Sequence, residues 1–161
     1  MSDWSSFFAG ELGAAAALAG LLFVSVSMNQ ARILALGRMA DRGLEALIIL
    51  LLVLVVSSVT LVPAQPMRLL GGEIVVAGMA TLLVIIPLQA GYVRHLDPVH
   101  RRRTTRTVWF NRIAVLVMTL AGLVLLARGD EAGLYLLPPA ILLSFGAAGS
   151  NAWVLLVEIN R

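Results

Sequence analysis

Glu11 and Asn29 are polar residues in a stretch of sequence that is otherwise apolar enough to cross a membrane. They are separated by about 18 residues, or five full turns of an α-helix, so their side chains point in the same direction. Ser25 lies within about 40° of this direction. The rise between the two residues is about 27 Å, close to the hydrocarbon thickness of about 30 Å. We therefore expect a seam with polar groups at both bilayer interfaces, which could line a pathway for ions or a small solute.

A second polar series lies near the C-terminus. Ser144, Asn151 and Glu158 recur every seven residues, so on a helix they drift by only about 20° per step and share one face. Asn151 lies well inside the expected membrane span. A lone amide there either hydrogen-bonds a neighbouring helix or faces a solute path, and the sequence leaves both interpretations open.

The charged residues expected within the membrane fall into two layers. Glu45, Arg112 and Glu158 lie near one interface, whereas Glu73 lies with Glu11 near the other. Ionisable groups inside a membrane are costly and often mark ion or proton paths. The first layer therefore predicts a buried charge cluster that could gate such a path. The alternative is that Arg112 is an interfacial arginine paired with Glu45 or Glu158.

Composition indicates a membrane protein. Hydrophobic residues make up 60% of the 161-residue chain and charged residues 13%, against roughly 45–50% and roughly 25% in soluble domains. The mean hydropathy is +0.94. Because one span takes about 20 residues, we expect residues 1–161 to form a single transmembrane domain. The chain has no cysteine and no lysine, which excludes thiolate chemistry and a Schiff base.

Five apolar runs predict an all-α, polytopic bundle of about five transmembrane helices. They cover residues 7–30, 44–64, 70–92, 108–127 and 133–159. In the third run, Gly71, Gly72, Gly78 and Pro87 could break or kink the helix, and the alternative count is four spans. Pro138 and Pro139 should kink the fifth helix or delay its start.

The arginines predict the orientation of the chain. They are concentrated in the first and third loops, with single arginines in the second and fourth. Basic loops remain in the cytoplasm, which predicts an N-terminus outside, a cytoplasmic C-terminus and an odd number of spans. A basic run at the cytoplasmic edge also attracts anionic lipid headgroups. The residues concerned are Arg101, Arg102, Arg103 and Arg106.

Small residues recur at four-residue spacing in the first and fifth expected helices. Such spacing lets helix backbones approach closely in a membrane. We expect these two helices to make the tightest contacts, either within one chain or between chains of a homo-oligomer. The packing residues are Gly10, Gly13, Gly20, Gly146 and Ser150.

Signals for catalysis, metal binding and nucleic-acid binding are absent from the sequence. His95, Asp97 and His100 share a loop, but their spacing matches no tetrahedral metal site. There is no phosphate-binding glycine loop or nucleophile elbow, and neither histidine lies in a span where it could ligate haem. The arginines do not form a nucleic-acid reading face. We expect no enzyme activity, no metal, no cofactor and no nucleic-acid partner.

Three segments carry a resemblance to known proteins: "GAAAALAGLLFVSVSMNQARIL", "RGLEALIILLLVLVVSS" and the ending "NAWVLLVEINR". They resemble a group of small bacterial polytopic membrane proteins without an assigned activity, some of which are labelled modulators of a membrane-bound protease. The resemblance implies a multi-pass protein of the bacterial inner (cytoplasmic) membrane. It implies no catalytic or binding residues.

Two functions are compatible with these patterns. The first is a homo-oligomer whose helices surround a pathway for ions or a small solute, since polar seams and rings of glutamate favour cation passage. The second is a non-conducting accessory or regulatory subunit, which uses the small-residue faces to dock onto another membrane protein.

Overall fold

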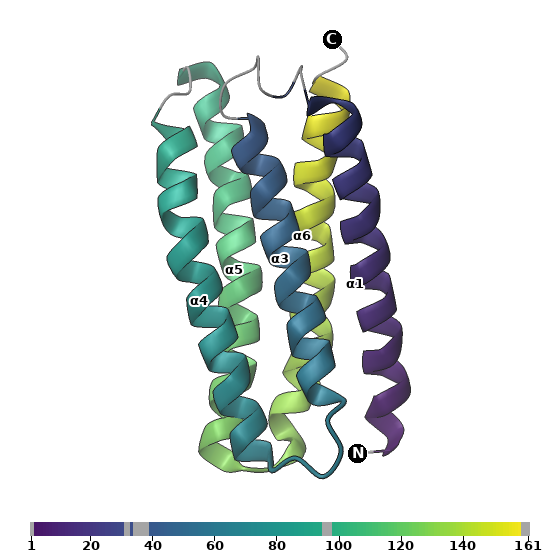
Figure 1. Ribbon diagram of the computed structural model, residues 1–161. Coiled ribbons are helices and arrows are strands. Elements are labelled where there is room, and N and C mark those ends of the chain that lie inside the picture. The colour runs from purple at the N-terminus through teal and green to yellow at the C-terminus, as the bar shows by residue number, and fades with distance from the viewer. Residues whose placement is uncertain (1, 31–32, 34–38, 95–97, 159–161) are drawn as a thin grey trace.

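The computed structural model describes residues 2–30, 33, 39–94 and 98–158 of the chain. These residues form five long helices and one short 3-10 helix (Figure 1). The elements are α1 (Ser2–Met28), α3 (Met39–Thr60), α4 (Met67–Val93), α5 (Pro98–Arg128), the 3-10 helix η1 (Glu131–Leu136) and α6 (Leu137–Glu158).

The five α-helices lie side by side in one bundle, and the two termini are at opposite ends of it (Figure 1). Each helix is long and apolar enough to cross a membrane, and the residues that the structure describes include no strand. The prediction of an all-α, five-span membrane protein is therefore confirmed. We call the end of the bundle that holds Arg42, Arg94 and Arg106 the arginine-rich end.

The helix boundaries differ from the predicted ones by several residues: α1 begins at Ser2 and α3 at Met39, each about five residues early, and proline accounts for further differences. α5 begins at Pro98, about ten residues before the expected start, because proline suits the first turn of a helix, where its missing N–H is not needed. α4 is one continuous helix from Met67 to Val93 with Pro87 inside it, so the alternative of a broken helix in this span is wrong. The predicted delay of the fifth span is confirmed, since α6 starts at Leu137 after η1.

The closest backbone packing joins α4 to α5. A Cβ atom added at Gly71 would lie 2.4 Å from the Leu126 nitrogen and 2.7 Å from the Gly122 oxygen. A Cβ added at Gly78 would meet the Thr119 side chain. Glycine is required at Gly71 because backbone atoms of α5 occupy the space, whereas at Gly78 the space is taken by the Thr119 side chain.

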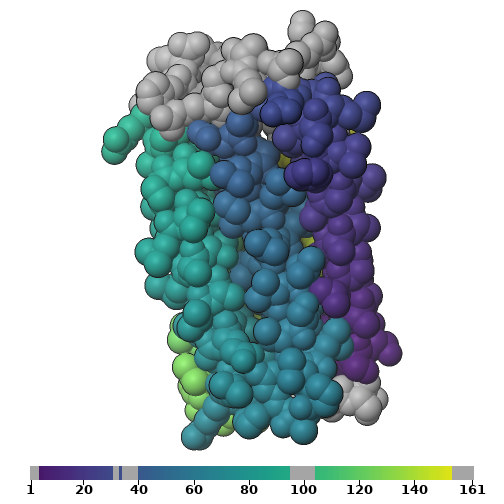
Figure 2. Space-filling model, in the orientation of Figure 1, coloured from purple at the N-terminus to yellow at the C-terminus, as the bar shows by residue number. Residues whose placement is uncertain are grey.

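The small residues expected to make the tightest contacts do not do so within one chain. Gly10, Gly13 and Gly20 are exposed, and a Cβ at any of them would have no other group within 4 Å. Among the described residues, a Cβ added at Gly146 would meet the Phe110 ring, at 3.6 Å. Figure 2 shows α1 along one edge of the bundle, so the glycine-bearing face of α1 is open to lipid or to another chain.

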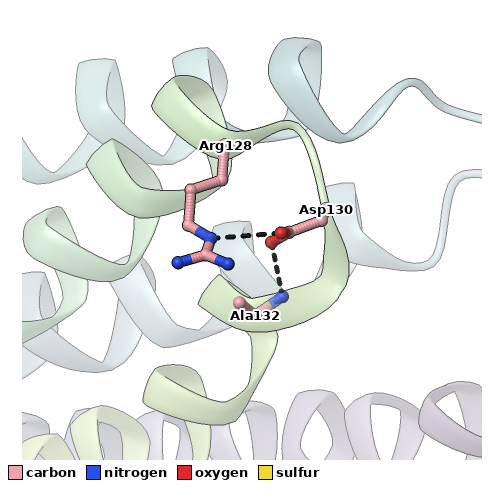
Figure 3. Close-up of polar contacts among 3 residues, drawn as sticks. All are labelled: Arg128, Asp130 and Ala132. Carbon is pink, nitrogen blue, oxygen red and sulfur yellow. Dashed lines mark hydrogen bonds and ion pairs between the residues drawn. The ribbon is translucent and has the colours of Figure 1, made fainter.

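The turn between α5 and η1 is built around Asp130 (Figure 3). Its Oδ1 accepts a hydrogen bond from the Ala132 N–H at 3.0 Å, and its Oδ2 pairs with the Arg128 Nε at 3.1 Å. Gly129 has φ +70°, a left-handed conformation that favours glycine, and donates its N–H to the Leu125 carbonyl. Asp130 therefore caps η1 directly after α5 ends.

These contacts predict a small pH dependence. The Ala132 N–H, followed by the Arg128 guanidinium, lowers the pKa of Asp130 below its ordinary value of 3.8. A lowered folded-state pKa means that the stabilisation is complete above the unfolded value and is lost as the pH falls through the folded value. We expect the thermal stability of the wild type to fall slightly more than that of Asp130→Asn between pH 5 and strongly acidic pH. Parallel melting curves for both proteins would show an identical pH dependence if the cap had no effect.

Candidate functional site: a buried carboxylate between three helices

Glu45 is a carboxylate with no exposed surface, held by hydrogen bonds from two neighbouring helices. Its Oε1 accepts from the Gln89 Nε2 at 2.5 Å and from the Asn111 Nδ2 at 2.7 Å. Its Oε2 accepts from the Tyr92 hydroxyl at 2.8 Å. We call Glu45, Gln89, Tyr92, Asn111 and Arg112 the Glu45 cluster. It joins α3, α4 and α5 through a single side chain.

Helix geometry explains how these residues meet. Gln89 and Tyr92 are three positions apart and therefore share one face of α4, directed at α3. Asn111 reaches the same carboxylate from α5. A carboxylate offers about four acceptor positions, and three of them are used here. Such charge-assisted hydrogen bonds are roughly twice as strong as neutral ones, so the cluster fixes the relative positions of the three helices.

Two arginines lie around this carboxylate without contacting it directly. The Arg112 Nε donates to the Gln89 Oε1 at 2.6 Å, so Gln89 bridges the guanidinium and Glu45. The Arg42 guanidinium carbon lies 5.7 Å from the centre of the Tyr92 ring, and its Nη2 donates to the Thr104 Oγ1 at 3.1 Å. The predicted cluster of Glu45 with Arg112 therefore exists, but the two residues are joined through an amide. The side chain of Glu158, expected in the same cluster, lies outside the described ones.

The polar seam of α6 faces the interior of the bundle. Ser144 and Asn151 are both fully buried. The Ser144 hydroxyl donates to the Ala140 carbonyl at 2.8 Å, whereas both side-chain polar atoms of Asn151 lack a hydrogen-bond partner among the described residues. The Oδ1 of Asn111 also lacks one. Buried polar atoms are nearly always hydrogen-bonded to protein or ordered water, so ordered water is the natural partner of these atoms.

Neighbouring contacts place Asn151 and the Glu45 cluster at similar depth. Thr107, Phe110 and Ser150 line one groove on the surface of the bundle, so the α5 segment that carries Asn111 lies beside the α6 segment that carries Asn151. On the other side, Ala46 and Ala148 belong to one buried apolar cluster. Glu45, Asn111 and Asn151 therefore lie in one layer near the arginine-rich end.

The polar seam of α1 is arranged differently. Ser25 and Asn29 are partly buried and hydrogen-bond within their own helix, Ser25 to the Leu21 carbonyl at 2.9 Å and Asn29 to the Ser25 carbonyl at 3.0 Å. Glu11, also partly buried, lies on the same side of the helix. The buried side of α1 is apolar and carries Ala15 and Leu22. The α1 seam therefore runs along the edge of its contact with the bundle and not through the core.

Glu73, the other expected outer carboxylate, accepts a hydrogen bond from the Gln65 Nε2 at 2.6 Å. It is separate from the Glu45 cluster, since Gln65 precedes α4 and lies toward the opposite end of the bundle. Glu73 holds the loop between α3 and α4 against the start of α4. Its role is local.

Among the residues that the structure describes, no group of three or more His, Cys, Asp or Glu side chains could hold a metal ion. His95 and Asp97 lie outside the described residues, and so does the side chain of His100. The same is true of the side chains of Arg101, Arg102 and Arg103, whereas Arg106 is described and exposed.

Tyr92 provides a direct test of the hydrogen bonds in the cluster. Tyr92→Phe removes one hydroxyl donor and keeps the ring beneath Arg42. Hydrogen bonds to charged groups contribute about 1.5–3 kcal/mol, so we expect the free energy of unfolding in detergent to fall by about that amount. Tyr135→Phe, at an exposed tyrosine on η1, is the matched control. Equal stabilities of the two variants would contradict the hydrogen bond to Glu45.

Comparison of the chain with known protein families, curated proteins and solved structures finds no match. The resemblance of the first two spans and the chain end to a group of small bacterial polytopic membrane proteins therefore stays a prediction.

Proposed function

We propose that this protein is a homo-oligomer of the bacterial inner membrane that provides a pathway for ions, and that the ion is the proton. The observation that carries the proposal is the complete burial of Glu45 among donors from α4 and α5. An ionisable residue inside a membrane is costly, and proteins that keep one commonly use it on an ion or proton path. Glu45 is the proposed proton-binding residue.

The packing of the bundle favours a proton over a hydrated ion. Buried apolar side chains such as Val53, Met118 and Ile141 fill the space between α3, α5 and α6. A hydrated cation requires a continuous channel, whereas a proton needs only polar groups and water within hydrogen-bond reach. The proposed path therefore runs between side chains of one bundle.

Buried polar residues continue from Glu45 along α3 and α6, which are antiparallel neighbours (Figure 1). On α6 they are Asn151 and Ser144, and on α3 the next is Ser57, about 18 Å below Glu45. The Oγ of Ser57 has no hydrogen-bond partner among the described residues. Polar atoms of this kind can be bridged by buried water.

A cavity lies beyond Ser57, at the end of the bundle opposite the arginine-rich end. It has a volume of about 260 Å³, and Trp4, Phe8, Thr60 and Leu134 are among the residues that line it. Thr60 is one turn beyond Ser57 on α3. The cavity offers a place where a path along α3 could reach the second interface.

Proton flux into liposomes that contain purified protein tests the proposal. With a potassium diffusion potential as driving force and a pH-sensitive dye inside, we expect Glu45→Gln to reduce the flux at least about tenfold. Asn151→Leu should also reduce it, because it removes the next polar group without touching Glu45. Glu73→Gln, a carboxylate outside the path, is the matched control and should conduct like the wild type. Wild-type flux from correctly folded Glu45→Gln and Asn151→Leu would refute the proposal.

The second candidate is a non-conducting accessory subunit, which the exposed glycines of α1 favour. Gly10, Gly13 and Gly20 leave the backbone of this helix open to close approach by another membrane helix. No flux from a folded, uniformly oligomeric sample would support this function. A membrane protein that then co-purifies with the wild type and is lost with Gly13→Leu would identify the partner.

A further inference from the structure

A shallow groove lies on the outer surface of the bundle between α5 and α6, near the arginine-rich end. Its volume is about 420 Å³. The residues that line it are Arg106, Thr107, Trp109, Phe110, Ile113 and Ser150. None of these residues belongs to the Glu45 cluster, so the groove is a separate feature of the molecule.

The lining changes from polar to apolar along the helix axis. Arg106 and Thr107 lie toward the end of the bundle, whereas Ile113 lies about 10 Å deeper in the membrane span. Trp109 and Phe110 lie between these two levels. Tryptophan is enriched where headgroups meet hydrocarbon. The groove therefore follows the polarity of a phospholipid, from a charged headgroup to an acyl chain.

Phe110 lines the apolar part of the groove, and Gly146 of α6 lies beside its ring. Phe110 is 36% exposed, and a Cβ at Gly146 would lie 3.6 Å from its ring. With no side chain at Gly146, nothing from this position covers the Cε1 and Cζ atoms of the ring. Trp109 is 55% exposed, and the Arg112 guanidinium carbon lies 5.7 Å from its ring centre. Trp109 thus borders the groove beside a cationic group.

We propose that this groove binds one anionic phospholipid. Arg106 holds the phosphate, and an acyl chain lies along Phe110 and Ile113. Charge complementarity selects an anionic phospholipid, because each basic residue near a membrane surface attracts anionic lipid. The turns of α5 that precede Arg106 carry three further arginines in sequence. The apolar half of the groove, at Phe110 and Ile113, favours a lipid over free phosphate. The proposal is independent of proton transfer.

The test is lipid retention measured by native mass spectrometry. Purified protein is exchanged into mixed micelles that contain phosphatidylglycerol or phosphatidylcholine, and bound lipid is counted. We expect the wild type to retain phosphatidylglycerol preferentially. Arg106→Gln should weaken this retention about fivefold, the equivalent of about 1 kcal/mol per basic residue. Arg94→Gln, an exposed arginine at the same end of the bundle, is the matched control and should retain lipid like the wild type.

A second pair of variants tests the apolar half. Gly146→Leu should fill the space beside Phe110 and reduce retention of phosphatidylglycerol, whereas Gly149→Leu, at a position with no other group within 4 Å, should not. Equal retention of the two lipids, or equal losses in Arg94→Gln and Arg106→Gln, would overturn the proposal in favour of non-specific attraction. Displacement of the lipid by inorganic phosphate alone would also overturn it, since the groove would then be a phosphate site.

Discussion

Gly71→Ala will strongly destabilise the protein. The new Cβ would lie 2.4 Å from the Leu126 nitrogen and 2.7 Å from the Gly122 oxygen, and both of these are backbone atoms. A side chain could rotate away, but two helix backbones can only move apart. Overpacking a core typically costs about 1–3 kcal/mol and occasionally more. We expect a loss of about 3 kcal/mol or more in the free energy of unfolding.

Gly72→Ala is the matched control, one residue further along the same helix. A Cβ at Gly72 has no other group within 4 Å, so the substitution should be neutral or slightly stabilising, since alanine favours a helix over glycine by up to about 1 kcal/mol. Unfolding of both variants by a denaturing detergent, followed by circular dichroism, gives the comparison. A Gly71→Ala protein as stable as Gly72→Ala would show that α4 and α5 do not pack this closely.

Glu45→Ala carries the second large effect. It leaves the Gln89 amide, the Tyr92 hydroxyl and the Asn111 amide without their common acceptor in the core. A buried polar group that loses its partner costs about 1–3 kcal/mol, so three such groups should together lower the free energy of unfolding by at least about 3 kcal/mol. Glu45→Gln should lie between this variant and the wild type, because its amide oxygen still accepts.

Glu73→Ala is the control for the loss of a membrane carboxylate in general. Glu73 is partly exposed and has a hydrogen bond from Gln65 alone among the side-chain bonds described. We expect this variant to lose less than half as much stability as Glu45→Ala. Similar losses in the two variants would mean that the hydrogen bonds of Glu45 do not join α3, α4 and α5.

The fold could be predicted from the sequence because a bilayer imposes strong length and polarity rules. Apolar runs interrupted by arginine, proline and glycine predicted five membrane-spanning helices, and the described residues form five helices long and apolar enough to span. The boundaries were less predictable. The segment from Pro98 to Thr107 is polar and rich in arginine, yet it continues α5 beyond the apolar run. Hydropathy detects what crosses the membrane, whereas a helix ends only where its backbone hydrogen bonds end.

The candidate site was only partly predictable. The seven-residue spacing predicted that Ser144 and Asn151 share a face, and the structure adds that both are buried. Glu45 and Arg112 were expected at one depth. Gln89 and Tyr92 were missed, although their three-residue spacing at the end of a span is a signal that could have found them. Their role depends on the rotation of α4 against α3, and glycine contacts between α4 and α5 help to set that rotation. The rotation of one helix against another cannot be predicted from the sequence pattern of a single helix.

The structure was also needed to show that the small-residue face of α1 is exposed. Four-residue spacing predicted close contacts for Gly13 but could not tell whether its partner is in the same chain. The bundle buries Ala15 and Leu22 of α1 and leaves Gly13 open. Sequence periodicity identifies a face of a helix, whereas its partner depends on the other helices.

The most direct test of the proposed proton path compares two conservative substitutions in the same liposome assay. Glu45→Gln changes the buried carboxylate inside the bundle, and Glu11→Gln changes the partly buried carboxylate at the edge of α1. A path through each bundle predicts that Glu45→Gln loses most of the proton flux while Glu11→Gln keeps it. Loss of flux in Glu11→Gln with full flux in a folded Glu45→Gln protein would contradict this account and place the path along α1 between subunits.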